Sequence, residues 1–267
     1  MRLRADSARL RAGLRHQELH TIFGTLPDAL FERALELGAG DGAQSRILVR
    51  WTSALVSTDI DQERLEPQHH PGIAYGICDA EDLPYRTGTF DLIFSSNLLE
   101  HLPDPAGAVS EMSRVLCDDG IMVHTMPNRF WKFLHLALFY PSQALLLIER
   151  LTMNLDTAGS KTGKGNNPKT GHPRFLRRNL WPPVHGTSPN NIVEWVRFGR
   201  TYWERVFRDA EFDVVKVENR LPVHSPYRFG FNRIRRRLER LGFTSYNGYV
   251  LRKSGHGSPH VRWFTGT

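Results

Sequence analysis

Apolar residues in this chain form two kinds of run, short continuous ones and longer ones with helical spacing. The two kinds alternate, which predicts an α/β fold with a doubly wound, mostly parallel sheet. We expect strands at residues 33–37, 54–58, 73–77, 90–96, 120–125, 212–217 and 246–251. We expect helices at residues 8–23 and 43–50, after residue 104, after residue 188, and at 231–241.

Three of these helices carry further signals. Asp104 is placed to cap a helix whose first residue is Pro105, and Ser188 and Pro189 begin another. The buried stripes are expected to be Val109, Met112, Val115 and Leu116 in the first helix and Ile192, Val196, Trp203, Val206 and Phe207 in the second. The third helix, 231–241, places Phe231, Ile234, Leu238 and Leu241 on one face and five arginines around the other. That helix either packs on the domain or meets a membrane surface or phosphate.

The first strand leads into three glycines at alternate positions, Gly38, Gly40 and Gly42. Asp59 follows the second strand and Asp79 the third, and in a parallel sheet these strand ends share one edge. A carboxylate about twenty residues past the glycines suits a ribose diol. The second carboxylate can accept from an exocyclic amine. Together these residues predict a nucleoside pocket.

The formal net charge of +7 lies in one segment of the 267-residue chain. Residues 128–189 carry nine basic residues against two acidic ones, so the remainder is formally neutral. This excess suggests contact with an anionic substrate, a phospholipid surface or nucleic acid, and a solvated loop explains it equally well.

About sixty residues separate the fifth strand from the next helix, far more than an ordinary connection. Within this insertion, residues 130–148 are rich in Phe and Leu but too interrupted for a membrane-spanning helix. They fit either a pair of lid helices over an apolar substrate or a segment lying on a membrane. Residues 157–170 have the Gly-, Lys- and Asn-rich composition of a mobile segment.

The two cysteines, Cys78 and Cys117, lie in different expected elements without metal-type spacing. We therefore expect reduced thiols, no metal site and a cytoplasmic protein. The Arg-rich start lacks an apolar run and so gives no secretory signal, and we interpret it as an ordinary N-terminal helix.

With these residues assembled, the chain resembles class I S-adenosylmethionine-dependent methyltransferases, most closely the type 11 subgroup of small-molecule and lipid methyltransferases. The matching text runs from ELGAGDG through TDID and CDAEDLPYRTGTFDLIFSSNLLEHLPDP to EMSRVL and MPN. The resemblance implies a Rossmann-like seven-stranded sheet whose last strand is antiparallel. It also implies S-adenosyl-L-methionine as cofactor. A methyltransferase domain is then expected at 33–253 with an insertion at 128–187, preceded by a helical segment 1–32 and followed by a flexible tail 254–267.

The resemblance also implies individual roles. The implied cofactor-binding residues are Glu36, Gly38, Gly40, Gly42, Asp59, Ile60, Asp79, Ala80 and Asn97. The glycines and Glu36 would shape the methionine end, Asp59 would hold the ribose, and Ile60 would lie against the adenine. Asp79, with Ala80 alongside, would accept from the adenine amine, and Asn97 would face the transferring methyl. For Asn97 a polar loop that caps the next helix remains the alternative.

The chain departs from the family pattern at two places, one that concerns the fold and one that concerns the substrate. Cys117-Asp118-Asp119-Gly120 replaces the usual Pro-Gly-Gly turn, which the fold tolerates because Asp and Gly both suit turns. No Asn-Pro-Pro-aromatic motif follows the fourth strand, which weakens the case for a base or amide nitrogen as the acceptor.

The function expected is methyl transfer to a small-molecule, lipid or glycan-linked acceptor, most readily at an oxygen. A hydroxyl nucleophile needs a base, and His101 and His185 are the catalytic candidates, although both also fit a structural role. Peripheral membrane contact through 128–187 and 231–241 is a further expectation. The alternatives are a non-catalytic cofactor-binding regulator and, disfavoured for want of a recognisable module, a nucleic-acid methyltransferase.

Overall fold

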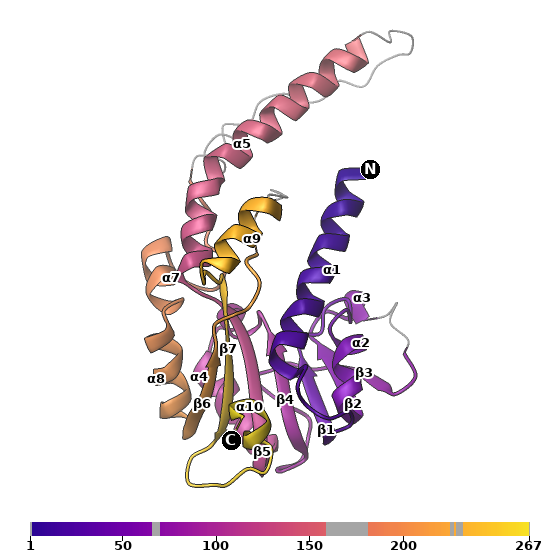
Figure 1. The fold of residues 1–267 in the computed structure, drawn as a ribbon, viewed down its shortest axis with the longest axis vertical. Helices are drawn as coiled ribbons and strands as arrows, with labels where there is room; N and C mark the ends of the chain where they lie inside the picture. The colour runs from indigo at the N-terminus through magenta and orange to yellow at the C-terminus, as the bar shows by residue number, and fades with distance from the viewer. Residues whose placement is uncertain (1, 66–69, 159–180, 225–226, 228–231, 267) are drawn as a thin grey trace.

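The computed structural model describes residues 2–65, 70–158, 181–224, 227 and 232–266. Its centre is a seven-stranded sheet in the order β3-β2-β1-β4-β5-β7-β6 (Figure 1). β7 pairs antiparallel with both β5 and β6, while β1 to β5 pair in parallel. The predicted fold class is therefore confirmed. The strands are β1 Phe31–Leu37, β2 Thr52–Asp59, β3 Ile73–Ile77, β4 Phe90–Ser96, β5 Leu116–Pro127, β6 Phe212–Glu218 and β7 Tyr246–Lys253.

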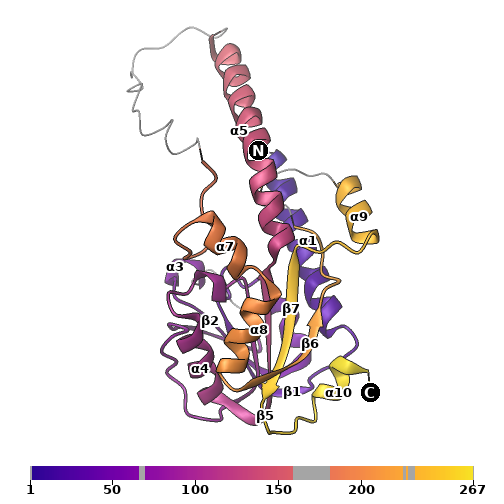
Figure 2. The same cartoon turned by 90° about the vertical axis from the view of Figure 1, so that its left-hand side faces the viewer.

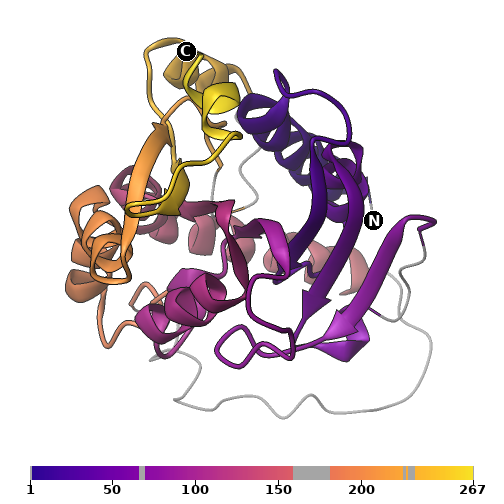
Figure 3. The ribbon, with the colours of Figure 1, turned by 90° about the horizontal axis from the view of Figure 1, so that it is seen from below.

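Helices cover both faces of the sheet (Figure 3). α1, the turn after α2, and α10 pack on one face through a core that includes Phe23, Trp51 and Phe264. α4 and α8 pack on the other through Met112, Trp203 and Phe207. The helices are α1 Arg2–Phe23, α2 Ser45–Leu48, α3 Gln62–Leu65, α4 Pro105–Val115, α5 Arg129–Ala158, α7 Asn191–Arg197, α8 Arg200–Asp209, α9 Asn232–Arg240 and α10 Val261–Thr265.

Local sequence signals explain α4 well. The Oδ1 atom of Asp104 accepts from the backbone N–H of Gly107 at 3.0 Å, and Pro105 occupies the first helical position, as predicted. The expected stripe of Val109, Met112 and Val115 is fully buried. A cap and a stripe at helical spacing were enough here because the helix packs on a neighbouring part of its own βαβ unit.

The expected single helix after residue 188 is wrong. The chain forms two helices, α7 and α8, with Asn190 as the first cap, and the break falls at Gly199. The guanidinium of Arg129 lies against this break: its Nε donates to the carbonyl of Trp195 at 3.2 Å, and a Cβ at Gly199 would lie 2.6 Å from it. Because α7 turns away, Ile192 and Val196 are exposed rather than part of the buried stripe.

The carboxyl-terminal segment, residues 254–267, was also misread as a flexible tail. Within the described residues it carries α10, and Phe264 is only 4% exposed. Its ring meets that of Phe23 edge-on, with centroids 5.9 Å apart. An apolar side chain in a short segment gives no periodic signal, so the sequence did not reveal this docking.

Residues 130–148 of the insertion lie in one long helix rather than a pair. α5 continues through Pro141 for 30 residues and extends away from the sheet (Figure 2). In the described part of the chain, no helix combines the length and apolarity that crossing a membrane requires. Most of the segment predicted to be mobile, 157–170, lies outside the described residues.

Candidate active site

The glycine turn after β1 lies at the carboxyl edge of the sheet. Gly38, Gly40 and Gly42 have φ values of +72°, +56° and +63°, a backbone region that favours glycine. A Cβ at Gly40 would touch nothing within 4 Å, so this turn leaves open space at its tip. The turn lies where the sequence predicted it. At position 40 glycine is favoured by the left-handed backbone and not by lack of space for a side chain.

Asp59 closes onto this turn. Its Oδ2 accepts from the N–H of Gly40 at 2.8 Å, and its Oδ1 accepts from the N–H of Asp61 at 3.0 Å. Each carboxylate oxygen keeps a further lone pair, so Asp59 can still accept from two ribose hydroxyls. The chain's own residues thus fit an adenosine cofactor at this point.

The neighbouring strand end brings Asp79 beside Asp59. The N–H of Cys78 donates to the backbone carbonyl of Asp59 at 3.3 Å. Asp79 is exposed and accepts from the N–H of Glu81, whereas Ala80 behind it is buried. Ile60 is 69% exposed at the rim. The four residues therefore share one corner of the sheet.

Glu36 is buried below the glycine turn. The hydroxyl of Ser57 donates to its Oε2 at 2.9 Å. Burial raises the pKa of the Glu36 carboxyl to about 6, because the ionised form loses hydration there. A bound ammonium group would offset that loss, which fits the methionine end of the cofactor.

Asn97, after β4, adopts a left-handed backbone with φ of +53°. Its N–H donates to the carbonyl of Thr125 at 2.8 Å. With the side-chain amide turned so that its oxygen faces Arg15, its nitrogen donates to the Tyr246 hydroxyl at 3.2 Å. Such a conformation in a non-glycine residue is uncommon and concentrates at functional sites.

Sequence reasoning missed the buried polar cluster beside Asn97. Glu18 of α1 is fully buried and accepts from Arg15 at 2.8 Å and from Thr125. Burial alone would raise the pKa of Glu18, but Arg15, His224 and Thr125 outweigh it and lower that pKa. The residues come from α1, β5 and the segment before α9, so no local motif announced them.

The two histidines expected to be catalytic do come together. The rings of His101 and His185 lie 4.7 Å apart in an edge-to-face arrangement. Burial lowers the pKa of both, to about 4 for His185. Between them and the core lies Glu100, which the sequence analysis did not select. Burial raises the pKa of its carboxyl to about 8, and it is only 6% exposed.

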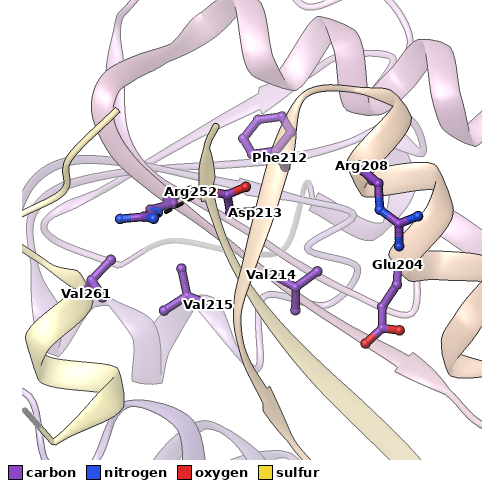
Figure 4. A pocket seen from close by; sticks show the side chains of 8 residues that line it. All are labelled: Glu204, Arg208, Phe212, Asp213, Val214, Val215, Arg252 and Val261. Atoms are coloured by element: carbon purple, nitrogen blue, oxygen red, sulfur yellow. Dashed lines mark hydrogen bonds and ion pairs between the residues drawn. The ribbon is translucent and has the colours of Figure 1, made fainter. Parts of the chain in front are cut away.

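A surface pocket of about 740 Å³ lies elsewhere. Figure 4 shows its lining, in which Asp213 and Arg252 stand beside Val214, Val215 and Val261. Phe212 begins β6 and Arg252 is the last residue but one of the antiparallel β7, so the pocket occupies the amino edge of the sheet. It is thus on the opposite edge from Gly40 and Asp59, and we assign it no part in the candidate site.

Known proteins match the part of the chain that carries the glycine turn and Asp59. Residues 35–124 match the family described as "Methyltransferase domain". A ubiquinone biosynthesis O-methyltransferase from Parvibaculum lavamentivorans is 29% identical over 106 residues, which is 38% of this chain and 42% of that protein. One of the same name from Methylococcus capsulatus is 28% identical over 52% of this chain and 69% of that protein.

The structural match extends further than the sequence match. A crystal structure of an S-adenosylmethionine-dependent methyltransferase from Mesorhizobium loti aligns with a TM-score of 0.53 at 17% identity, covering 89% of this chain and 98% of that one. For most of the curated relatives, by contrast, the match spans less than half of the relative's length. Residues 35–124 therefore match the methyltransferase-domain family, and the chain shares its fold with a known S-adenosylmethionine-dependent methyltransferase.

Proposed function

We propose that this protein transfers a methyl group from S-adenosylmethionine to an oxygen of a small-molecule, lipid or glycan-linked acceptor. The observation that carries the proposal is the position of two carboxylates beside the glycine turn. Asp59 accepts a hydrogen bond from Gly40, and Asp79 lies at the end of the adjacent strand. The names of the curated relatives, two of them O-methyltransferases of ubiquinone biosynthesis, support oxygen as the acceptor atom.

The chain's residues divide the work of binding. Asp59 accepts from the ribose hydroxyls and Asp79 from the adenine amine, while Ile60 lies against the ring and Ala80 backs it. Glu36 and the glycine turn, Gly38 to Gly42, hold the methionine end, and the loop that begins at Asn97 borders the methyl group. When bound, the cofactor supplies a sulfonium methyl with its own leaving group. The protein therefore needs chiefly to align the acceptor and exclude water.

His101 and His185 are the residues we assign to the acceptor's proton. Their lowered pKa values leave both imidazoles neutral near pH 7, as a proton acceptor must be. His101 lies four residues past Asn97, and the His185 ring is in contact with it. The acceptor hydroxyl would then lie between these rings and the methyl end of the pocket.

Calorimetry with S-adenosylhomocysteine tests the cofactor site directly. We expect saturable binding to the unmodified protein and a loss of about 100-fold or more in Asp59→Ala, because hydrogen bonds to a charged group contribute about 1.5–3 kcal/mol each. Asp119→Ala, at an exposed position near the amino end of β5 and so at the opposite edge of the sheet, is the matched control. No heat with the unmodified protein would remove the proposal. Incorporation of labelled methyl into a cell extract then separates an enzyme from a non-catalytic regulator.

We also propose that the acceptor is presented at a membrane surface, with α5 and α9 as the contact. Phe133 and Leu145 on α5 and Ile234 on α9 are each more than half exposed. Phe130 of α5 contacts the segment that follows α9, with its ring 5.0 Å from that of Phe243. Exposed apolar side chains beside the exposed arginines of α9 suit an anionic lipid surface.

Vesicle flotation tests the membrane contact. We expect the full chain to float with vesicles containing anionic phospholipid and to float less with zwitterionic ones. Ile234→Asp with Leu241→Asp should reduce flotation, whereas the exposed Ile192→Asp on α7 should not. Equal flotation of all variants would dismiss this contact. A steep salt dependence with nucleic acid instead of vesicles would favour the nucleic-acid alternative.

A further inference from the structure

We propose that Glu100, His101 and His185 bind one divalent transition-metal ion of the Zn²⁺ type. Each residue offers one ligand atom, and these atoms all lie within 4.8 Å of one another. Two imidazole nitrogens with one carboxylate oxygen are a common donor set for such ions. His101 follows Glu100 directly, whereas His185 comes from a loop far along the chain, so this set exists only in the folded protein.

The Glu100 carboxylate supplies the strongest reason. The residue is only 6% exposed, and neither carboxylate oxygen has a hydrogen-bond partner among the described residues. The nearest opposing group is the Nε2 atom of His101, 3.9 Å from Oε1. Burying a carboxylate without partners is costly unless a cation or donor satisfies it. A bound ion would satisfy both the carboxylate and the adjacent imidazoles.

The loop that carries His185 is fixed against Glu100. Its backbone N–H and that of Gly186 donate to Oε1 of the buried Glu194 at 2.7 and 2.8 Å. The N–H of Thr187 donates to the carbonyl of Glu100 at 3.2 Å. A Cβ at Gly186 would lie 2.2 Å from that same carbonyl oxygen, so only glycine permits this approach. The third ligand is thus held in place by contacts independent of any ion.

The spacing is that of a site able to close on an ion. Zn–N bonds of about 2.0–2.1 Å in a tetrahedral site place ligand atoms about 3.4 Å apart. The 3.9 Å between Glu100 and His101 needs only small side-chain rotations to reach that value. Three protein ligands also leave at least one position open, as in catalytic rather than structural zinc sites.

That open position gives the ion a role that rests on the proposed function. With the ion bound, His101 and His185 serve as its ligands, and the ion rather than either imidazole activates the acceptor hydroxyl. Glu100 lies three residues past Asn97, the residue that we expect to face the methyl group of the cofactor. An acceptor hydroxyl bound to the ion would release its proton to solvent or a neighbouring base more readily. The oxygen would then form its bond to the methyl carbon as the sulfur–carbon bond breaks, which leaves S-adenosylhomocysteine.

The test uses the full chain without a histidine tag, treated with a chelator and dialysed. Titration with ZnCl₂ in a calorimeter should show one equivalent bound per chain, and Co²⁺ should give the visible absorption of a low-symmetry site. Glu100→Gln and His185→Ala should each weaken Zn²⁺ binding by at least ~10-fold, since even outer contacts of metal ligands contribute that much. His256→Ala, an exposed histidine, should bind as the unmodified protein does.

Binding of S-adenosylhomocysteine separates this proposal from the proposed function. If each variant still binds it, the variants are folded and any loss of Zn²⁺ affinity belongs to the metal site. Suppose that neither the unmodified protein nor any variant binds S-adenosylhomocysteine, but Glu100→Gln and His185→Ala still bind Zn²⁺ more weakly than His256→Ala does. The metal site would then stand and the proposed function would fall. Absence of saturable Zn²⁺ binding, or equal affinity in Glu100→Gln, His185→Ala and His256→Ala, would overturn the metal site.

Discussion

The two halves of the sheet's carboxyl edge are built differently. At the ends of β1 to β3, contacts join residues close in sequence, such as Gly40 with Asp59 and Glu36 with Ser57. At the ends of β4 and β5, they join distant ones, such as Glu18 with Thr125, 107 positions apart. The first half, the cofactor half, relies on backbone conformation and strand ends. The second, the acceptor half, relies on buried charge, so substitutions should affect the two halves in different ways.

The largest effect is expected at the buried ion pair of the acceptor half. Lys132 and Glu194 are both fully buried and form a salt bridge. Lys132→Met leaves the Glu194 carboxylate without its partner, and we expect the free energy of unfolding to fall by about 3–5 kcal/mol in urea denaturation. Adding Glu194→Gln should restore most of it, because the amide oxygen can still accept from the N–H of His185. A loss below ~1 kcal/mol in Lys132→Met would contradict this account.

A smaller loss is expected where α1 meets the sheet. Glu18→Ala removes the acceptor of Arg15 and Thr125, and we expect a cost of about 2–3 kcal/mol by the same measurement. The loss should be smaller than in Lys132→Met because the Arg15 side chain is 25% exposed and can reach water. Glu32→Ala, on the exposed part of β1, is the control. An equal loss of unfolding free energy in Glu18→Ala and Glu32→Ala would show that the contacts of Glu18 do not stabilise the fold.

The pH dependence of stability should also come mainly from the acceptor half. His124 of β5 is buried, with its Nδ1 2.8 Å from the Ser95 hydroxyl, and burial lowers its pKa to about 3. Between pH 6.5 and 3 the unfolded chain therefore binds a proton that the native imidazole does not. The contribution of His124 to stability is complete above pH 6.5 and is lost as the pH is lowered through this window, by about 1.4 kcal/mol per pH unit.

Comparing His124→Asn with the unmodified protein isolates that contribution. The variant should have a shallower pH slope by about 1.4 kcal/mol per unit between pH 6 and 4. The exposed His256→Asn should leave the slope unchanged. Identical slopes in the unmodified protein and His124→Asn would mean that the native imidazole takes up its proton in this range.

The same contrast explains what the sequence could predict. The glycine turn, Asp59 and the cap of α4 were found because each signal and its partner lie within a few turns or one βαβ unit. Glu100 was missed because only the loop around Gly186 makes it a buried, unpaired carboxylate. The break between α7 and α8 lies against Arg129 of α5, and Phe264 packs against Phe23 of α1, both far away in the sequence. An apolar pattern shows that a side chain seeks burial but not which distant surface provides it.

The smallest effect on stability is expected in the cofactor half, at Gly40. A Cβ there meets nothing within 4 Å, so Gly40→Ala costs only the strain of a left-handed backbone, about 1 kcal/mol. Gly257 also has open space but no positive φ, so Gly257→Ala should leave stability unchanged or slightly raised. Binding of S-adenosylhomocysteine should nevertheless weaken in Gly40→Ala alone, because the added methyl group occupies the open tip of the turn. If Gly40→Ala bound S-adenosylhomocysteine as tightly as the unmodified protein does, the cofactor could not lie against the Gly40 turn and Asp59.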